Sequence, residues 1–400
     1  MSEKFSSFAK NGMVVSSQPL ATLAGVRVLM DGGNAIDAAV ATAAVLGVVE
    51  PSSLGIGGDA FALFYSAKDK ALKALDASGR SPYAASLDFC RKSGFKGMPQ
   101  RGIHSVTVPG AVHGWSTLLN SYGTRKLSEV LRAAIHYADE GFPVAELTAE
   151  SWHESEAGLK DDEGAAINYL VNGRAPKAGE IFKNPRMAKT LRRIADEGAD
   201  VFYKGDIAEK IVRCSEKKRG LFTVKDFADH RSDWVEPVTA NYRGYDVYEL
   251  PPATHGFVTL EMLKIVEGFD VKAMGAQSAD AWHLMIEAKK LAFADRDRYL
   301  ADRDYMKVRV SDLFAPKRVE ALRSRFCSDQ AAGEFETVPL AADTEYVAAA
   351  DSEGNLVSFI QSNFMGFGSG LVEPETGIVL QNRGHLFSID ESHPNCIGPH

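Results

Sequence analysis

The segment from residue 344 to residue 362 constrains the fold of this chain most strongly. Two runs with strand-forming residues, 344–351 and 356–362, flank the polar sequence Ser352-Glu353-Gly354-Asn355. This pattern predicts two β-strands joined by a short turn. Thr344 stands where a polar loop becomes a strand. A chain that cuts itself would place a new N-terminal nucleophile at such a point, although β-propensity alone also explains a threonine at a strand start.

The composition is that of a soluble globular protein. Hydrophobic residues make up 45% and charged residues 24% of the 400 residues, which excludes disorder as the dominant state. Layered α/β proteins can bury a chain of this length in one unit. The net charge is −8, and the Lys and Arg residues are scattered along the chain. The chain therefore lacks the basic surface that nucleic acids or anionic membranes require.

The N-terminal sequence and the cysteines indicate a reducing cytoplasm. Residues 1–10 lack the apolar core of a secretory signal. The most apolar run, residues 35–49, is short and contains Asp37, which favours a buried helix over a membrane span. The four cysteines lie far apart and form no CxxC pair. We therefore expect a cytoplasmic protein without a disulfide framework or a zinc site.

Punctuating residues predict the other elements. Pro19 opens a helix that ends at Gly32-Gly33, and Asn34 is suited to cap the next helix. The glycine-rich turn 51–59 lacks the glycine spacing and the Lys-Ser/Thr pair of a phosphate-binding loop. Helical periodicity dominates residues 116–235, including 127–138 and 184–197. Further predictions are helices over 258–267 and 282–300 and strands over 60–66, 71–76 and 242–250.

The helix over residues 282–300 carries a pair of residues that could suggest a metal site. His283 and Glu287 lie four residues apart and share a helix face. A metal site would need a third ligand, and the HExxH pattern is absent. A structural ion pair between the two side chains is therefore the favoured interpretation.

An N-terminal threonine combines a nucleophile with its own base. The hydroxyl of Thr344 is weak until a base takes its proton, and a free α-amine on the same residue would serve as that base. Such an amine has a pKa of about 7.7–8.0, so a useful fraction is neutral near pH 7. The peptide bond between Asp343 and Thr344 must first break. The same hydroxyl could attack the carbonyl of Asp343 if the loop held that bond strained and accessible.

Several sequence blocks resemble, in order, those of the γ-glutamyltransferase family. The resemblance covers essentially the whole chain and rests on residues 12–21, 32–41, 50–61, 108–115, 249–252, 287–296 and 367–370. It implies an α/β N-terminal-nucleophile hydrolase with a four-layer αββα sandwich, made as a precursor that cuts itself. On this resemblance, residues 1–343 are similar to the large subunit, with 330–343 as an exposed loop before the cleavage site. Residues 344–400 are similar to the beginning of the small subunit.

The resemblance also implies roles for single residues. Thr344 would attack a substrate amide, form an acyl-enzyme, and pass the acyl group to water or an amine. Arg80 matches the family arginine that pairs with the substrate's α-carboxylate, and a guanidinium fork suits a planar carboxylate. Ser362 takes the place of a hydroxyl residue near the amine of the nucleophile. A solvated ion pair is the structural alternative for Arg80.

The sequence departs from the γ-glutamyl-specific pattern near the acyl-binding site. The nucleophile is followed by Glu345-Tyr346 instead of Thr-His or Ser-His. The family residues that hold the α-ammonium of a glutamyl group fall at Phe364, Arg383 and Leu386. The ammonium clamp is therefore missing, and Arg383 adds a second cation that would favour an acid without that ammonium. This pattern resembles the branch of glutaryl-cephalosporin acylase-like enzymes and oxamate amidohydrolase, and a structural ion pair is the alternative for Arg383.

The family pattern also extends beyond the position that matches His400. In the family, a glycine pair in that later part supplies oxyanion-hole N–H groups, and loss of one such donor costs about 10²–10³ in rate. The expectation from the resemblance is therefore a C-terminally incomplete sandwich, a fragment of an enzyme.

Together these features predict a self-processing amidase that acts on a small amide substrate bearing a carboxylate. It would pass the acyl group from Thr344 to water or an amine, with the two parts of one precursor as partners. No cofactor and no metal are required, and a homo-oligomer is compatible with the sequence. Two alternatives stay open: a true γ-glutamyltransferase or glutathione hydrolase, and an uncleaved, non-catalytic family member or fragment.

Overall fold

The computed structural model describes residues 6–333 and 344–400 of the chain. It divides into two compact units. The first unit comprises Met1–Trp234, Leu340–Leu386 and Gly398–His400, and the second comprises Val235–Pro339 and Phe387–Ile397. Each unit is described by itself below.

A six-stranded sheet organises the first unit. Its strand order is β1-β9-β10-β2-β3-β6. The pairs β1–β9, β9–β10, β10–β2 and β2–β3 are antiparallel. The strands are β1 (Gly12–Val15), β2 (Asp59–Ser66), β3 (Ala71–Ala77), β6 (Asp233–Val235), β9 (Glu345–Asp351) and β10 (Leu356–Ser362). The hairpin predicted over residues 344–362 is confirmed. It lies between β1 and β2, so the last part of the chain occupies the middle of a sheet that the first part begins.

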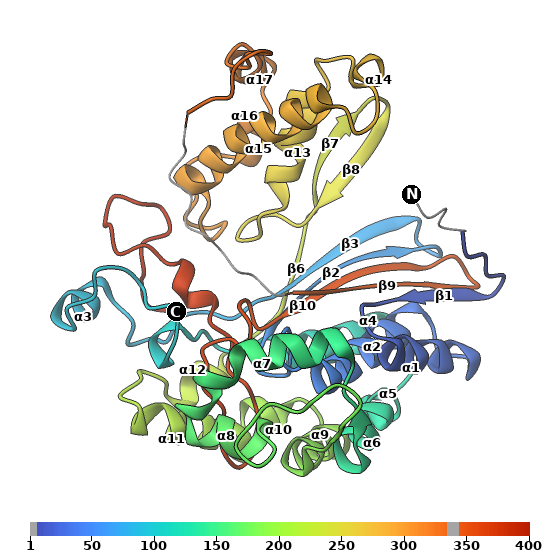
Figure 1. Ribbon diagram of the computed structural model, residues 1–400, viewed down its shortest axis with the longest axis vertical. Helices are drawn as coiled ribbons and strands as arrows, with labels where there is room; N and C mark the ends of the chain where they lie inside the picture. The colour runs from blue at the N-terminus through green and yellow to red at the C-terminus, as the bar shows by residue number, and fades with distance from the viewer. Residues whose placement is uncertain (1–5, 334–343) are drawn as a thin grey trace. The chain divides into compact units, whose positions relative to one another are not determined.

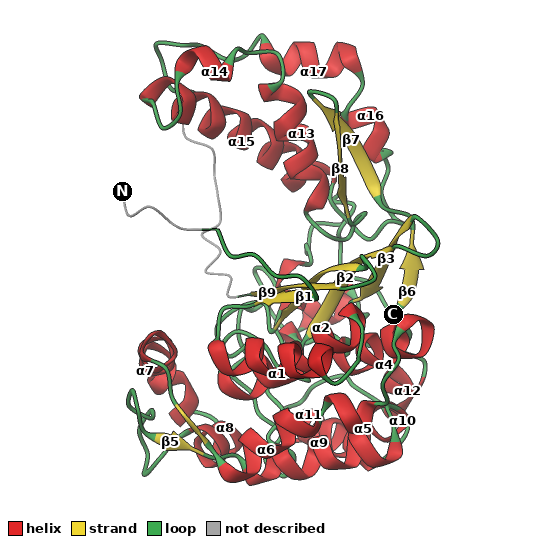
Figure 2. Cartoon of the chain, turned by 90° about the vertical axis from the view of Figure 1, so that its right-hand side faces the viewer, coloured by secondary structure: helices red, strands yellow, loops and turns green. Residues whose placement is uncertain are grey.

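One face of this sheet packs on two helices. Because side chains alternate along a strand, the register places Val347 of β9, Phe359 of β10 and Ala62 of β2 on the same face. All three are buried in the main core with residues of α1 (Pro19–Met30) and α2 (Ala35–Val49). Figures 1 and 2 show α1 and α2 directly against this face of the sheet.

A capping box at the start of α2 explains the charged residue in the most apolar run. The side chain of Asn34 accepts the N–H of Asp37, and the Asp37 carboxylate accepts the N–H of Asn34. Asp37 also accepts the backbone N–H and the hydroxyl of Thr124. The helix is buried along its whole length, as expected. Within the described residues, no helix combines the length and apolarity that crossing a membrane would demand.

Further helices form a second layer below α2, which confirms the helix-rich region (Figure 2). The structure divides the helix predicted over 127–138 into two helices, α5 and α6. Leu131 is both the C-terminal cap of α5 and the N-terminal cap of α6. The elements between β3 and β6 are α3 (Leu87–Lys92), η1 (Ile103–Ser105), α4 (Ala111–Tyr122), α5 (Leu127–Val130), α6 (Arg132–Glu140), β4 (Phe142–Pro143), α7 (Glu146–Lys160), α8 (Glu163–Tyr169), β5 (Ile181–Phe182), α9 (Pro185–Glu197), α10 (Asp200–Tyr203), α11 (Asp206–Lys217) and α12 (Val224–Ala228).

The opposite face of the six-stranded sheet is also apolar. In cross-strand register, Tyr346 of β9 lies beside Ile360 of β10, which lies beside Phe61 of β2. Tyr346 is 48% exposed and Ile360 is 36% exposed. The same face carries further exposed or half-exposed apolar side chains: Met13, Val15, Leu63, Tyr65 and Leu356.

The second unit is a small hairpin with helices. It comprises β7 (Val238–Tyr242), β8 (Tyr245–Glu249), α13 (Gly256–Val266), α14 (Val271–Met274), α15 (Ala279–Tyr299), α16 (Val310–Leu313) and α17 (Pro316–Arg323). The ion pair predicted between His283 and Glu287 is replaced by other contacts. Glu287 binds Lys290 at 2.7 Å, and His283 Nε2 lies 2.9 Å from the carbonyl oxygen of Cys327.

Candidate active site

The two predicted site residues on the β9–β10 hairpin meet at one end of the sheet. Thr344 directly precedes β9 and is exposed, whereas Ser362 ends β10 and is 2% exposed. Their hydroxyl oxygens lie 2.8 Å apart. The Ser362 hydroxyl also accepts the backbone N–H of Phe364 at 2.7 Å. The antiparallel pairing of the hairpin causes this contact, because it brings the start of β9 beside the end of β10.

Asp59 lies next to this pair and is completely buried. It opens β2 and is the cross-strand partner of Ser362. One oxygen of its carboxylate accepts the N–H of Gly79 at 3.2 Å, and the other accepts Nε–H of Arg383 at 2.7 Å. Nothing in the local sequence pattern singles out Asp59 as a site residue. The one sequence feature that could have drawn attention to Asp59 is its position as a charged residue between a glycine-rich turn and an apolar strand.

Arg383 forms the ion pair that its structural interpretation predicts, and its partner is Asp59. The residue begins the short helix η2 (Arg383–Leu386). Its guanidinium also lies over the rings of Phe61 and Phe364, at 5.3 and 5.5 Å from their centroids. Burial raises the pKa of Asp59 to about 6 even though Arg383 acts in the opposite direction. The pair is therefore held together in a setting that disfavours the charge of the carboxylate.

Arg80 belongs to the loop that follows β3 and is anchored from both sides. The preceding residue, Gly79, donates its N–H to Asp59, and the carbonyl of Arg80 accepts the N–H of Val108. A side chain at Gly79 would collide with the chain, since a Cβ there would lie 1.5 Å from the carbonyl oxygen of Val108. Asp59 thus contacts Arg383 directly and the loop of Arg80 through one backbone N–H.

The guanidinium of Arg80 has its own carboxylate partner. Arg80 Nη2 lies 3.1 Å from Asp233, and both side chains are about one quarter exposed. Burial opposes the ionisation of Asp233, but Arg80 and Arg231 outweigh it and hold the pKa of Asp233 below its usual value. Nearby, burial lowers the pKa of His230 to about 3, so this histidine is neutral at pH 7. The ion pair that was the structural alternative for Arg80 is therefore present.

Other predicted features lie outside the site or outside the described residues. Asp343 and residues 334–342 of the predicted pre-cleavage loop are not among the described residues, and residues 330–333 are exposed. Within residues 6–333 and 344–400, no group of three His, Cys, Asp or Glu residues is arranged to hold a metal ion. The candidate site therefore consists of the hydroxyl pair of Thr344 and Ser362, and of two arginines that each bind a carboxylate. Asp59, the partner of Arg383, lies opposite Ser362 in the sheet.

Comparison with known proteins identifies the family. Residues 21–400 match the family model described as gamma-glutamyltranspeptidase. The chain belongs to the gamma-glutamyltranspeptidase family. This confirms the resemblance predicted from sequence and places the chain in the N-terminal-nucleophile hydrolase superfamily.

Two curated relatives of the gamma-glutamyltranspeptidase family align with nearly the whole chain. The glutathione hydrolase-like YwrD proenzyme of Bacillus subtilis (strain 168) is 40% identical over 97% of this chain and 73% of its own length. The oxamate amidohydrolase proenzyme of Klebsiella pneumoniae is 34% identical over 98% of this chain and 75% of its own length. Both names describe precursors.

A solved structure confirms the fold class. The crystal structure of a cephalosporin acylase from Bacillus halodurans superposes with a TM-score of 0.93 at 42% identity. The match covers 100% of this chain and 74% of the acylase chain. The mixed α/β fold predicted from sequence is therefore the fold of this gamma-glutamyltranspeptidase family member.

Proposed function

We propose that this protein is a self-processing amidase in which Thr344 is the nucleophile. The observation that carries the proposal is the contact of 2.8 Å between the hydroxyl oxygens of Thr344 and Ser362. It places a hydroxyl at the start of a central strand, beside a polar partner, in a family that contains proenzymes. A threonine at that place is equipped for chemistry once its backbone nitrogen is free.

The first reaction releases that nitrogen. The Thr344 oxygen attacks the carbonyl carbon of Asp343, a C–O bond forms, and the C–N bond of the peptide breaks. The nitrogen takes the proton that the hydroxyl has lost and becomes the α-amine of Thr344. Water then hydrolyses the ester, which restores the Thr344 hydroxyl and leaves the main-chain carbonyl of Asp343 as a free α-carboxylate.

The second reaction uses the released amine as a base. It accepts the hydroxyl proton while the Thr344 oxygen attacks the carbonyl carbon of a substrate amide. The proton passes to the leaving amine as the C–N bond breaks, and the acyl group remains on the threonine oxygen. Water or a second amine then takes the acyl group and restores the hydroxyl.

The proposed cut divides residues 1–343 from residues 344–400 without separating them in space. β9 lies between β1 and β10, and β10 pairs with β2. Ladder hydrogen bonds thus join the two parts on both sides of the hairpin. We propose that they remain together as a large and a small subunit.

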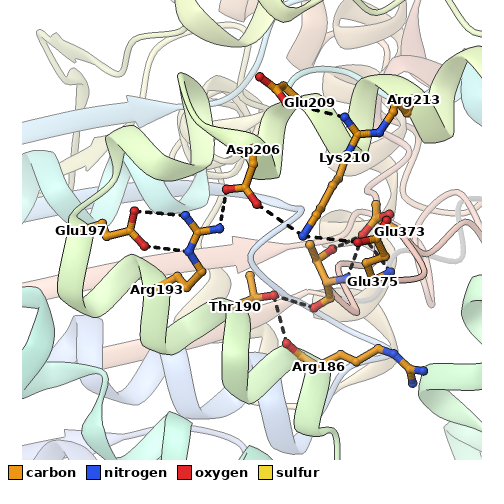
Figure 3. A network of polar contacts seen from close by, with 11 residues as sticks. Arg186, Thr190, Arg193, Glu197, Asp206, Glu209, Lys210, Arg213, Glu373 and Glu375 are labelled. Atoms are coloured by element: carbon orange, nitrogen blue, oxygen red, sulfur yellow. Dashed lines mark hydrogen bonds and ion pairs between the residues drawn. The ribbon is translucent and has the colours of Figure 1, made fainter.

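A polar network provides a second attachment between the two parts (Figure 3). Lys210 on α11 binds both Asp206 and Glu375, at 3.4 and 3.5 Å. Thr190 on α9 donates its hydroxyl to the carbonyl of Thr376. The segment after β10 is therefore fastened to the helical layer of the large part.

The proposed substrate is an amide with a carboxylate on a small acyl group. Arg80 and Arg383 supply two cations, and each arginine side chain is about one quarter exposed although it binds a carboxylate. The oxamate amidohydrolase and the cephalosporin acylase among the relatives have names consistent with such substrates. Phe364 and Leu386 provide no acceptor for the α-ammonium of a glutamyl group.

Glutathione hydrolysis is the second candidate function. The name of the Bacillus relative and the 35% identical glutathione hydrolase proenzyme of Escherichia coli favour it. The absence of an acceptor side chain at Phe364 and Leu386 argues against it, because an unpaired buried ammonium is costly.

We also propose that the apolar outer face of the sheet is covered by a second β layer in the complete αββα sandwich. Tyr346, Leu356 and Ile360 are exposed apolar side chains on this face, of the kind that sheet packing buries. The solved acylase extends beyond the 74% that this chain covers. Ile360→Lys should cost more than about 1 kcal/mol in urea unfolding if the face is covered, and less than about 0.5 kcal/mol if it faces water.

An amide hydrolysis assay tests the function. The purified protein is given glutaryl, oxamyl and γ-glutamyl amides with the same leaving group, and the Thr344→Ala variant serves as the control. We expect a preference for the donors without an α-ammonium and no turnover by the variant. A preference for the γ-glutamyl donor would support the second candidate. Equal turnover by the variant would eliminate Thr344 as nucleophile, and an uncleaved, inactive protein would support the non-catalytic alternative.

A further inference from the structure

We propose that Asp59 is a positioning residue that sets the preference for a carboxylate-bearing acyl group by orienting Arg383. This inference rests on the proposed function, since it concerns the acyl donor of the same site. It adds a residue that the predicted site did not contain. Its basis is the set of contacts around the Asp59 carboxylate.

The contact with Arg383 leaves one edge of the guanidinium available. Asp59 engages the Nε–H of Arg383 at 2.7 Å, and a guanidinium carries four further N–H groups on its two Nη atoms. Asp59 is fully buried whereas Arg383 is 26% exposed. The side chain of Arg383 therefore reaches solvent although that of its partner does not. A planar carboxylate can pair with the two Nη groups side by side.

Aromatic rings restrict the same guanidinium. The rings of Phe61 and Phe364 lie within 5.5 Å of its central carbon. The backbone N–H of Phe364 binds the Ser362 hydroxyl, which contacts Thr344. Phe364 therefore contacts the guanidinium through its ring and the Ser362–Thr344 pair through its backbone N–H. An arginine without the Asp59 contact would lose this orientation.

The backbone around Asp59 makes its position rigid. Its carboxylate is held by the N–H of Gly79, where no side chain fits, and its strand position is fixed opposite Ser362. Asp59 therefore relates the orientation of Arg383 to the position of the nucleophile. A residue that holds another side chain in this way acts on binding more than on the chemical step.

The ionisation of Asp59 supports this role. Burial raises its pKa to about 6, and Asp76 on β3 adds to this rise, whereas Arg383 and the N–H of Gly79 oppose it. Burial raises the pKa of the Tyr203 hydroxyl on α10 above its usual value, and the charge of Asp59 adds a smaller contribution in the same direction. Below pH 6, Asp59 gains a proton and loses its charge-assisted bond to Arg383. A glutaryl carboxylate stays ionised there because its pKa is about 4.3, the ordinary value for such a group.

The first test compares two donors of equal length. Glutaryl and valeryl anilides have the same acyl chain, but only the former ends in a carboxylate. We expect Asp59→Asn to lower the glutaryl-to-valeryl ratio of kcat/KM at least tenfold, mainly through KM for the glutaryl donor. Arg383→Gln should lower the ratio by a similar factor, and the double variant should lower it no further. Ser358→Ala, on the same sheet but outside the site, serves as the control.

A second measurement requires no variant of Asp59. In the unmodified protein, the glutaryl-to-valeryl ratio should fall as the pH drops from 7 to 5, whereas in Arg383→Gln it should be flat. The ratio cancels the titration of the Thr344 amine, which both donors share. A ratio that is independent of pH in the unmodified protein would overturn the inference. A rise in the ratio for Asp59→Asn would also overturn it, because Asp59 would then compete with the substrate for Arg383.

Binding distinguishes a failure of this inference from a failure of the proposed function. Titration calorimetry compares glutaramate with valeramide on the Thr344→Ala protein and on the same protein with Asp59→Asn. Tighter binding of glutaramate that is lost in the second protein supports the role of Asp59 even if no donor is turned over. Equal binding of the two amides, or a preference that survives Asp59→Asn, overturns it even if Thr344-dependent hydrolysis is found.

Discussion

Asp59 and Ser362 lie opposite each other in the register of β2 and β10, and their side chains serve different parts of the site. The Ser362 hydroxyl contacts Thr344, and the Asp59 carboxylate contacts Arg383. One cross-strand pair thus relates the hydroxyl of the proposed nucleophile to a cation. Because a shift of one residue would send every side chain of a strand to the other face, the sheet register itself determines this site.

Ser362→Ala should slow self-cleavage at least tenfold. The variant loses the contact with the Thr344 hydroxyl and leaves the N–H of Phe364 without its acceptor. A buried N–H without an acceptor costs about 1–3 kcal/mol of stability. The rate is measured from the appearance of two fragments on a denaturing gel.

Ser358→Ala provides the matched control for Ser362→Ala. Ser358 belongs to the same strand, is only half-buried, and lies beside Ala348 and Leu63 rather than Thr344. The Ser358→Ala variant should cleave itself at the rate of the unmodified protein. Equal rates for the two variants would remove Ser362 from the site.

Arg80→Lys should raise KM for a glutaryl amide about tenfold or more, with a smaller effect on kcat. A lysine keeps the charge but loses the planar fork that pairs with a carboxylate. Arg231→Lys is the control, since Arg231 also binds Asp233 but is far more exposed. Steady-state kinetics of both variants check this. If the two changes have the same effect, Arg80 serves only the ion pair with Asp233.

Stability should depend on pH through Asp59. Its folded pKa is about 6 against a reference of 3.8, so the folded protein binds this proton more tightly than the unfolded chain. The resulting stabilisation is complete below pH 3.8 and is lost as the pH rises through 6. It amounts to about 3 kcal/mol for this carboxylate.

Urea unfolding of the unmodified protein and of Asp59→Asn measures this dependence. Since other groups titrate in both proteins, the difference between the two free energies of unfolding isolates Asp59. The unmodified protein should gain stability relative to the variant as the pH falls from 7 to 4. A difference that stays constant over this range would contradict the raised pKa.

Gly79→Ala should destabilise the first unit by about 1–3 kcal/mol or more, as expected for overpacking. The added Cβ would lie 1.5 Å from the Val108 carbonyl oxygen, so the loop that carries Arg80 must move. Gly97→Ala is the control, because a Cβ there would have no atom of the described residues within 4 Å other than those of its chain neighbours. Thermal unfolding compares the two variants. Equal midpoints would show that the loop has more freedom than these contacts allow.

Local patterns were sufficient to predict much of the fold. Alternation predicted the hairpin that became β9 and β10, and Asn34 correctly marked the start of α2. The site around Asp59 could not be predicted in this way. Its partners Gly79 and Arg383 lie 20 and 324 residues away in the chain, and only the sheet brings them together.

The errors have the same physical origin. His283 and Glu287 share a helix face, yet the ring of His283 reaches the carbonyl of Cys327, which lies 44 residues further on. Glu287 instead binds Lys290 on its own helix. Spacing along a helix shows which side chains could meet, but tertiary partners decide which contacts form.

The most direct test of the central claim is the mass and N-terminal sequence of the purified polypeptides. Self-processing predicts two fragments, the smaller beginning with Thr344, and a single intact polypeptide for Thr344→Ala. One unbroken chain in the unmodified protein, a cut at another bond, or cleavage that persists in Thr344→Ala would contradict the assignment of Thr344 as the nucleophile.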